Sequence, residues 1–199
     1  MPQPIRRDKW IGFDFTPEAI LERPELAAHV AGISALWNEI DANITMTLLA
    51  LLGAEAKTGM SIYLSITNDG AKRAAMDAIC RLKLSADDQD TMRSLLTKVG
   101  KRYADRNKVI HGAWGVSPVY PKELLWGDIR EQILMHVGLL ALTRPEDGKG
   151  RYRIMVEHQN KYLEVWNLQD FENTEKRLRA TLDDLAKFTR PILDRAFGR

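Results

Sequence analysis

The chain has 199 residues, of which 45% are hydrophobic and 28% are charged, and this globular composition excludes a disordered chain. The formal net charge is +2, so no global field draws the protein to nucleic acid or to an anionic membrane, and any basic site must be local. The single cysteine, Cys80, excludes an internal disulfide and is typical of a reducing compartment.

The N-terminal segment is expected to be an irregular arm over residues 1–24, because it contains four prolines. Its first 14 residues mix charged side chains with no apolar run, so we expect no secretory signal. The longest apolar stretch, around Met46–Leu52, falls well short of the roughly 18–20 residues that span a bilayer. We therefore expect a cytoplasmic protein with no membrane partner.

Helical periodicity follows the arm. Apolar residues step by three and four from Leu26 to Leu48, which predicts a long helix over 24–52 that ends at Gly53. Shorter helices are predicted over 59–66 and 69–82.

The next predicted helix begins with Ser85 and Asp88, which have the spacing of a capping box. Its apolar side runs from Met92 to Ile110, and the helix is expected to stop at Gly112.

After Gly112 the sequence predicts short strands as well as helices. The expected elements are, in order, strands over 113–117 and 123–126, a helix over 128–142, a turn over 146–150, and a hairpin of strands over 152–157 and 162–168. A final helix begins at Asp170, and Pro191 is expected to kink or interrupt it.

The elements together predict a mainly α fold, an up-and-down helical bundle with a small antiparallel β-sheet inserted before the C-terminal helix. We predict a single domain, because the sheet lies between helices in the sequence. Its parts are the arm (1–24), the bundle (25–112 and 170–199) and the inserted sheet and helix (113–169).

The strongest chemical signal is Arg106, Asn107 and His111 at the end of the helix that begins near Ser85. Asn107 and His111 are four residues apart and share a helix face. Arg106 starts about 140° round the helix from His111, and its long side chain can swing over the same spot. Guanidinium binds phosphate in a bidentate manner, and imidazole gives or takes a proton near neutral pH.

Basic residues surround this motif. Residues 98–108 carry five basic side chains and one acidic side chain, which predicts a local phosphate-binding patch. Besides Arg106, the basic members are Lys98, Lys101, Arg102 and Lys108.

The bare spacing of Arg and His is a poor signal, because Arg153 and His158 share it. That second pair lies in a predicted strand, where residues five apart point to opposite faces. We therefore discard it and keep the pair at Arg106 and His111.

Residues 106–112 resemble the signature of HEPN domains, in which Arg, a polar residue, a short spacer and His end a late helix of an up-and-down bundle. The resemblance covers the predicted helices, with the sheet as an insertion. It implies a metal-independent ribonuclease without a cofactor, often a toxin or part of phage defence. His111 would be the acid–base residue, Arg106 the phosphate stabiliser and Asn107 the orienting residue.

The resemblance also implies partners. HEPN proteins usually form homodimers through the bundle, so that two motifs share one cleft. RNA, a nucleotide or an antitoxin is then the expected partner.

Three hypotheses remain open: this ribonuclease, a catalytically silent HEPN-like module that binds a nucleotide, RNA or a protein, and a structural helical protein. The structural hypothesis requires His111 to be buried against Trp114 or the sheet, whereas the other two require Arg106 and His111 to lie in an open, basic groove. Tryptophans in the predicted strands are expected to pack in the core, with base stacking as the alternative. The remaining histidines lack metal-ligand spacing, so no metal site is expected.

Overall fold

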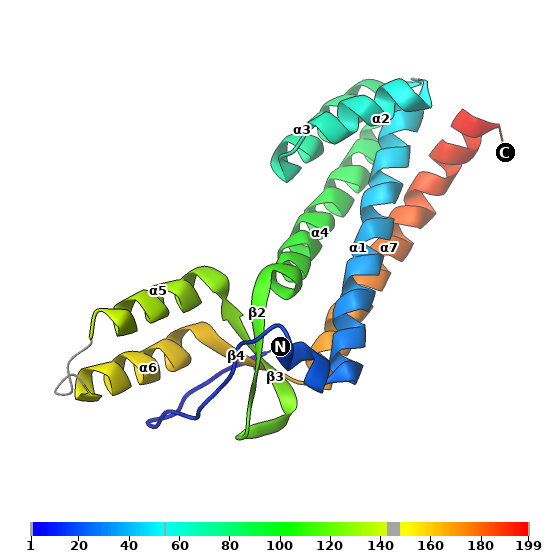
Figure 1. Cartoon of the computed structure of the whole chain (residues 1–199). Coiled ribbons are helices and arrows are strands. Elements are labelled where there is room, and N and C mark those ends of the chain that lie inside the picture. The colour runs from blue at the N-terminus through cyan, green and yellow to red at the C-terminus, as the bar shows by residue number, and fades with distance from the viewer. Residues whose placement is uncertain (1, 54, 143–147, 199) are drawn as a thin grey trace. The chain divides into compact units, whose positions relative to one another are not determined.

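The computed structural model describes residues 2–53, 55–142 and 148–198, and it is mainly helical with a small antiparallel sheet (Figure 1). The predicted fold class is confirmed at this level. The elements are β1 (Gln3–Pro4), the short 3-10 helix η1 (Ala19–Glu22), α1 (Pro24–Leu52), α2 (Ala56–Ser65), α3 (Asp69–Lys83), α4 (Ala86–His111), β2 (Gly112–Ser117), β3 (Tyr120–Asp128), α5 (Ile129–Leu140), α6 (Gly148–Tyr162), β4 (Leu163–Trp166) and α7 (Leu168–Phe197).

The chain divides into two compact units. Unit 1 comprises Met1–Ile33 and Asn107–Glu175, and unit 2 comprises Ser34–Arg106 and Lys176–Arg199. Each of the three long helices, α1, α4 and α7, contributes residues to both units.

Unit 2 is helical, and polar contacts join its long helices. Thr189 Oγ1 of α7 donates to Asn43 Oδ1 of α1 at 2.7 Å. Two ion pairs join α4 to α7 in antiparallel order, Lys98 with Asp184 and Asp105 with Arg177. The buried side chains of this unit include Ile40, Leu48, Met92, Leu178 and Leu185.

Local signals set the helix ends in this unit. Gly53 ends α1 in the left-handed conformation (φ +61°), and its N–H donates to Leu49 O at 3.1 Å. At the start of α4, the Asp88 N–H donates to Ser85 Oγ at 3.3 Å, and Ser85 Oγ donates to Asp88 Oδ2 at 2.8 Å. These ends confirm the predicted Gly53 stop and the predicted Ser85–Asp88 start.

The predicted interruption at Pro191 does not occur, because α7 continues through it to Phe197. Proline removes one backbone N–H. Pro191 is exposed in the last two turns of α7, while Ile192 beside it is buried. Burial of the apolar face therefore carries the helix past the proline.

Unit 1 is built on the antiparallel sheet, in the order β1-β4-β3-β2. The strand predicted over 162–168 is confirmed as β4, and the first two predicted strands form the β2–β3 hairpin, in which Trp114 pairs with Trp126. The core of the sheet contains Ile5, Leu125 and Leu163, none more than 1% exposed.

The N-terminal residues are not only the irregular arm that was expected. Gln3 and Pro4 form an edge strand, and Ile5 is buried in the core of the sheet. Gln159 of α6 is fully buried, where its Nε2 donates to Lys9 O at 2.7 Å and its Oε1 accepts from the Ile11 N–H at 3.2 Å. The Gln159 amide therefore supplies hydrogen-bond partners for backbone groups of the N-terminal arm that lie outside the sheet.

The strand predicted over 152–157 is wrong, because these residues belong to α6. Aromatic and β-branched residues alternate at Tyr152, Ile154 and Val156, which favours a strand locally. Helix α6 packs beside α5 (Figure 1), and the burial of His158 at this contact overrides the local preference. In the turn predicted over 146–150, residues 146–147 lie outside the described residues and 148–150 are the first residues of α6.

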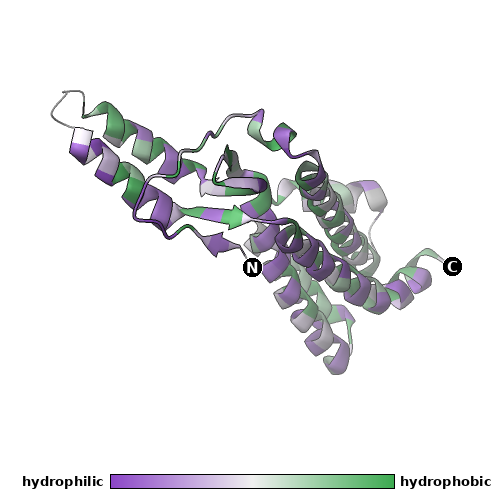
Figure 2. Cartoon of the chain, turned by 90° about the horizontal axis from the view of Figure 1, so that it is seen from below, coloured by the Kyte–Doolittle hydropathy of each residue, from purple (hydrophilic) through white to green (hydrophobic). Residues whose placement is uncertain are grey.

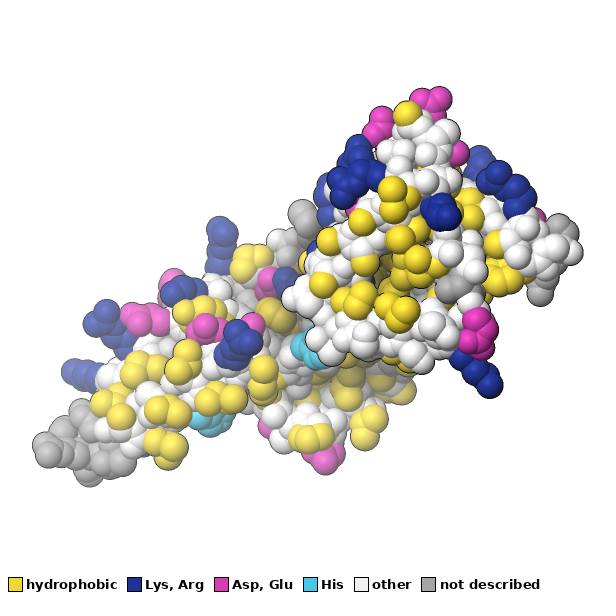
Figure 3. Space-filling view, turned by 90° about the horizontal axis from the view of Figure 1, so that it is seen from above, with side chains coloured by type: hydrophobic (Ala, Val, Ile, Leu, Met, Phe, Trp, Pro, Cys, Tyr) yellow, Lys and Arg dark blue, Asp and Glu magenta, His cyan; other side chains and the backbone are white. Residues whose placement is uncertain are grey.

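The helix predicted over 128–142 is confirmed as α5, with Asp128 Oδ1 accepting from the Arg130 N–H at 2.8 Å. Along the long helices, apolar residues are interspersed with polar ones (Figure 2). Helix α5 exposes an apolar face, whose side chains are among the yellow ones at the lower left of Figure 3. That face contains Ile129, Ile133, Leu134, Val137 and Leu140. Among the helices of the described residues, none is long and apolar enough to cross a membrane.

Candidate functional site

The motif residues lie together on the last turns of α4, and the helix ends where the sequence predicted. His111 is the final helical residue and is exposed, whereas Arg106 and Asn107 are half-buried. The unit boundary passes through the motif, since Arg106 is the last residue of its segment in unit 2 and Asn107 begins a segment of unit 1. The structural hypothesis required a buried His111, and the exposed position of this residue does not meet that requirement.

Two tryptophans hold the end of the helix that carries His111. Trp126 Nε1 donates to Lys108 O at 2.6 Å, and Trp114 Nε1 donates to Val109 O at 3.1 Å. The last four carbonyls of an α-helix have no partner within the helix. The two indoles therefore satisfy carbonyls that would otherwise need water, and they anchor the last turn to the sheet.

Gly112 is required by this arrangement. A Cβ at position 112 would lie 1.7 Å from Trp126 Nε1, so only glycine allows the indole to approach the helix end. The glycine after His111 therefore has a structural reason, and its presence in the motif is no evidence for catalysis.

Lys108, predicted to bind phosphate, is engaged in unit 1. Its Nζ lies 2.6 Å from Glu164 Oε2 and 4.8 Å from the centre of the Trp126 ring. The ammonium group therefore braces the helix end against β3 and β4, and a phosphate would have to compete with the carboxylate for it.

Aromatic packing supports the same helix end. Trp114 lies 5.5 Å from Trp166 and 5.4 Å from Phe171, measured between ring centres. Trp166 and Phe171 are buried. This confirms the core-packing interpretation for Trp166, while Trp114 and Trp126 are half-buried between the core and the helix end.

The other basic residues are divided between ion pairs and a groove. Lys98 pairs with Asp184 at 2.9 Å, and both side chains are half-exposed, so this pair is weak and open to exchange with a phosphate. Arg102 pairs with Asp105 at 3.0 Å, and Asp105 also lies 3.4 Å from Arg177. Lys101 is exposed and lines a groove between α3 and α4.

Arg153 and His158 were predicted to lie in a strand, with their side chains on opposite faces, and this prediction is wrong. Both residues lie on the helix α6, so they are not on opposite faces of a strand. Arg153 is exposed and pairs with Glu157 at 2.7 Å, whereas His158 is buried. A buried imidazole and a paired, solvent-facing guanidinium do not form a joint phosphate site.

The remaining histidines were expected to hold no metal. His29 Nδ1 contacts Glu175 Oε1 at 2.9 Å, and His136 Nδ1 contacts Gln132 O at 2.8 Å. Within residues 2–53, 55–142 and 148–198, no three His, Cys, Asp or Glu side chains gather as a metal ion would require.

Sequence reasoning missed the tryptophan clamp and the groove between α3 and α4. The only local signal for the clamp was Gly112, because the pairing of Trp126 with the helix end depends on the register of β2 with β3. The only local signal for the groove was Gly100, a glycine in a helix interior, where it costs stability.

Comparisons with protein-family models, with curated proteins and with solved structures found no match to this chain.

Proposed function

We propose that the protein is a HEPN-like, metal-independent ribonuclease in which His111 transfers the proton and Arg106 stabilises the phosphorane. The observation that carries the proposal is the exposed His111 at a clamped helix end, with Arg106 and Asn107 within five residues of it on α4. A rigid mounting of this kind is what a proton-transfer residue needs, because misplacement of the imidazole costs rate.

The chemistry follows from the residue types. Attack of the ribose 2′-hydroxyl on the adjacent phosphorus requires removal of its proton, which an imidazole near neutral pH can accept. Negative charge then grows on the phosphorane oxygens, and a bidentate guanidinium offsets it. Asn107, on the same helix face as His111, orients the imidazole or the phosphate.

A second copy of the chain completes the proposed site. The 5′-oxygen leaves as an alcohol and needs a proton from an acid, while the 2′-hydroxyl needs a base. One motif contains one histidine, so a homodimer that pairs two motifs supplies both groups. A toxin or phage-defence role, with an antitoxin as partner, belongs to the same proposal.

The test is RNA cleavage by the purified protein in EDTA, with His111→Ala and Arg106→Lys alongside. We expect His111→Ala to abolish cleavage without changing the melting temperature, because His111 is exposed. Arg106→Lys keeps the charge and loses the bidentate fork, so cleavage is expected to fall at least tenfold.

Lys83→Ala is the matched control, an exposed cation at the end of α3 outside the motif, and it should cleave like the parent. Equal cleavage by the parent and His111→Ala would refute the proposal.

A second candidate function is a catalytically silent HEPN-like module that binds a nucleotide, RNA or a protein. It is favoured by the ion pairs of Lys98, Arg102 and Lys108, which leave fewer cations for a transition state. RNA binding without cleavage by the parent protein would select this function over the ribonuclease.

A further inference from the structure

The N-terminal arm runs beside helix α6, and both belong to unit 1 (Figure 1). Asn160 of α6 holds the backbone of Arg7 at two points. Its Oδ1 accepts from the Arg7 N–H at 2.9 Å, and its Nδ2 donates to Arg7 O at 2.8 Å. Gln159 holds the following residues through Lys9 O and the Ile11 N–H. This part of the arm is therefore a fixed part of the surface.

The fixed part of the arm carries three exposed cations. Among the residues that the structure describes, Arg6, Arg7 and Lys9 form no ion pair. Asp8 is the one acidic residue between them in the sequence. Three positive charges and one negative charge give these four residues a net charge of +2, which equals the formal net charge of the whole chain.

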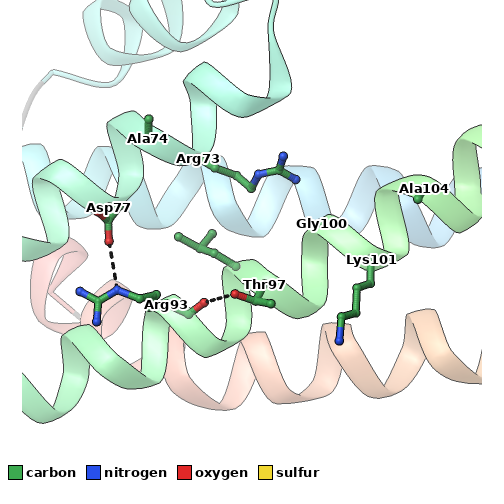
Figure 4. A pocket seen from close by; sticks show the side chains of 9 residues that line it. Arg73, Ala74, Asp77, Arg93, Thr97, Gly100, Lys101 and Ala104 are labelled. Carbon is green, nitrogen blue, oxygen red and sulfur yellow. Dashed lines mark hydrogen bonds and ion pairs between the residues drawn. The ribbon is translucent and has the colours of Figure 1, made fainter.

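Several cations elsewhere on the surface are already paired. In the groove between α3 and α4, Arg93 lies 3.7 Å from Asp77 (Figure 4) and 2.7 Å from Asp90. Lys98 and Lys108 also pair with carboxylates. An anion would have to displace a carboxylate from each of these side chains, whereas the cations of the arm need only lose water.

An exposed aromatic ring lies beside the cations of the arm. The Trp10 N–H donates to Oη of Tyr152 on α6 at 3.2 Å, so this tyrosine lies next to the residue that follows Lys9. Tyr152 is 47% exposed, whereas Trp10 is half-buried with its ring 4.1 Å from that of Phe13. Tyr152 therefore offers an aromatic surface to a ligand bound by the arm.

The combination of cations and an aromatic ring defines the ligand. Cations bind the phosphates of any polyanion, but an aromatic side chain adds affinity only where a base is free to stack on it. The bases of a duplex are already stacked on one another, and a lipid headgroup has no base. Proteins that bind single strands combine cations along the backbone with aromatic side chains in this way.

We propose that the arm and α6 bind single-stranded RNA, with phosphates on Arg6, Arg7 and Lys9 and a base stacked on Tyr152. The choice of RNA rests on the proposed function, whereas the affinity for an unpaired strand rests on these four residues. The amides of α6 hold the arm in place before binding, so less conformational entropy is lost when the strand binds. This surface adds affinity and takes no part in proton transfer.

The first test is the fluorescence anisotropy of a labelled single-stranded oligoribonucleotide in EDTA, titrated with His111→Ala to prevent cleavage. Adding Arg6→Ala, Arg7→Ala and Lys9→Ala together should weaken binding at least tenfold. Loss of three phosphate contacts should also reduce the slope of log K against log salt by about 2.

The matched control adds Lys83→Ala, Lys122→Ala and Lys187→Ala to His111→Ala, which removes three exposed lysines outside the arm and α6. We expect this control to change the affinity less than twofold. Equal weakening by the two triple variants would overturn the proposal, because the affinity would then follow the net charge of the protein and not this surface.

Tyr152→Ala and Tyr152→Phe, each added to His111→Ala, test the stacking. Both remove the hydroxyl that accepts from the Trp10 N–H, but phenylalanine keeps the ring. We expect the alanine variant to bind at least fivefold more weakly with an unchanged salt slope, because stacking releases no counterions. The phenylalanine variant should bind within twofold of His111→Ala. Equal affinity of the two Tyr152 variants would overturn the assignment to an unpaired strand.

Asn160→Ala tests whether the arm must be fixed. This substitution removes both hydrogen bonds to the Arg7 backbone and changes no charge. We expect the Arg7 amide to exchange its hydrogen faster and the affinity for the oligoribonucleotide to fall several-fold. Faster exchange with an unchanged affinity would overturn the role of the fixed arm.

Duplex RNA of the same sequence and vesicles of phosphatidylserine are the other probes. The single strand should bind at least tenfold more tightly than the duplex, and the vesicles should not bind. Equal affinity for the duplex would overturn the assignment to a single strand. Binding to the vesicles without binding to RNA would assign the surface to a membrane and would also overturn the proposal.

The ribonuclease and the arm surface can fail separately. If the parent protein cleaves no RNA while the arm variants lose binding, the ribonuclease fails and the arm surface stands. If His111→Ala abolishes cleavage while the arm variants bind RNA as tightly as His111→Ala alone, the arm surface fails and the ribonuclease stands.

Discussion

The four histidines of this chain differ in their surroundings, and these surroundings assign them different tasks. His111 is exposed at a helix end, His29 contacts Glu175, and His158 is buried between α5 and α6. His136 is also exposed, but only His111 ends a helix with an arginine and an asparagine within five residues of it. Residue type alone could not separate them, because burial depends on which helices pack together.

Burial of His158 predicts a dependence of stability on pH. Desolvation lowers the pKa of His158, chiefly because the charged form loses water, with His136 lowering it further and Glu131 opposing both. The unfolded chain has the ordinary histidine pKa of about 6.5. Below that pH the unfolded state binds a proton that the folded state does not, so stability falls as the pH drops through 6.5 toward the lowered pKa.

We therefore expect the melting temperature to fall between pH 7.5 and pH 5.5, and His158→Gln to reduce this fall. Thermal unfolding at several pH values measures the effect, with the exposed His111→Ala as the control that keeps the full pH dependence. An identical pH profile for His158→Gln and the parent would contradict this account.

At the scale of elements, α4 shows how one helix combines local and distant signals. Its first turn is set by Ser85 and Asp88, three residues apart, and this pair can be recognised in the sequence. Its last turn is held by Trp114 and Trp126, which reach it through the β2–β3 hairpin. The helix therefore starts on local chemistry and ends on a tertiary contact.

Trp126→Phe tests the clamp at the end of α4. Phenylalanine keeps the ring and removes the donor, which leaves the Lys108 carbonyl without its indole partner. We expect the free energy of unfolding to fall by about 1–2 kcal/mol, measured by urea denaturation. Amide hydrogen exchange of residues 108–113 should also quicken.

Trp10→Phe is the control for the clamp substitution, a half-buried tryptophan outside α4 and the sheet. It should leave the exchange of residues 108–113 unchanged. Unaltered exchange in Trp126→Phe would show that the indole does not hold the helix end.

At the scale of the whole molecule, two compact units share three long helices. Helix formation is cooperative along the chain, so melting of a helix in one unit is expected to destabilise its continuation in the other. We therefore expect a single unfolding transition, as for the single domain predicted from the sequence.

Core substitutions in the two units test this expectation. Leu163→Ala in unit 1 and Met92→Ala in unit 2 each remove a fully buried side chain, at a cost of about 2–5 kcal/mol. Each should lower the one melting temperature seen by calorimetry. Two separate transitions, with each substitution moving only one of them, would show instead that the units unfold independently.

The sequence by itself determined the elements whose signals are local. Gly53 ended α1, Ser85 and Asp88 began α4, and the period of three and four gave the long helices their apolar faces. The position of His111 at a helix end followed from the same local signals. These features depend on residues a few positions apart, so no knowledge of the fold was needed.

Tertiary structure alone decided the rest. Residues 152–157 became helix because α6 packs beside α5, and Gln3 and Pro4 became a sheet edge because they pair with β4. The close approach of Arg73 to Gly100 likewise joins residues of two helices. Each of these outcomes depends on contacts between segments far apart in the chain, whose energies exceed the local preferences that a sequence displays.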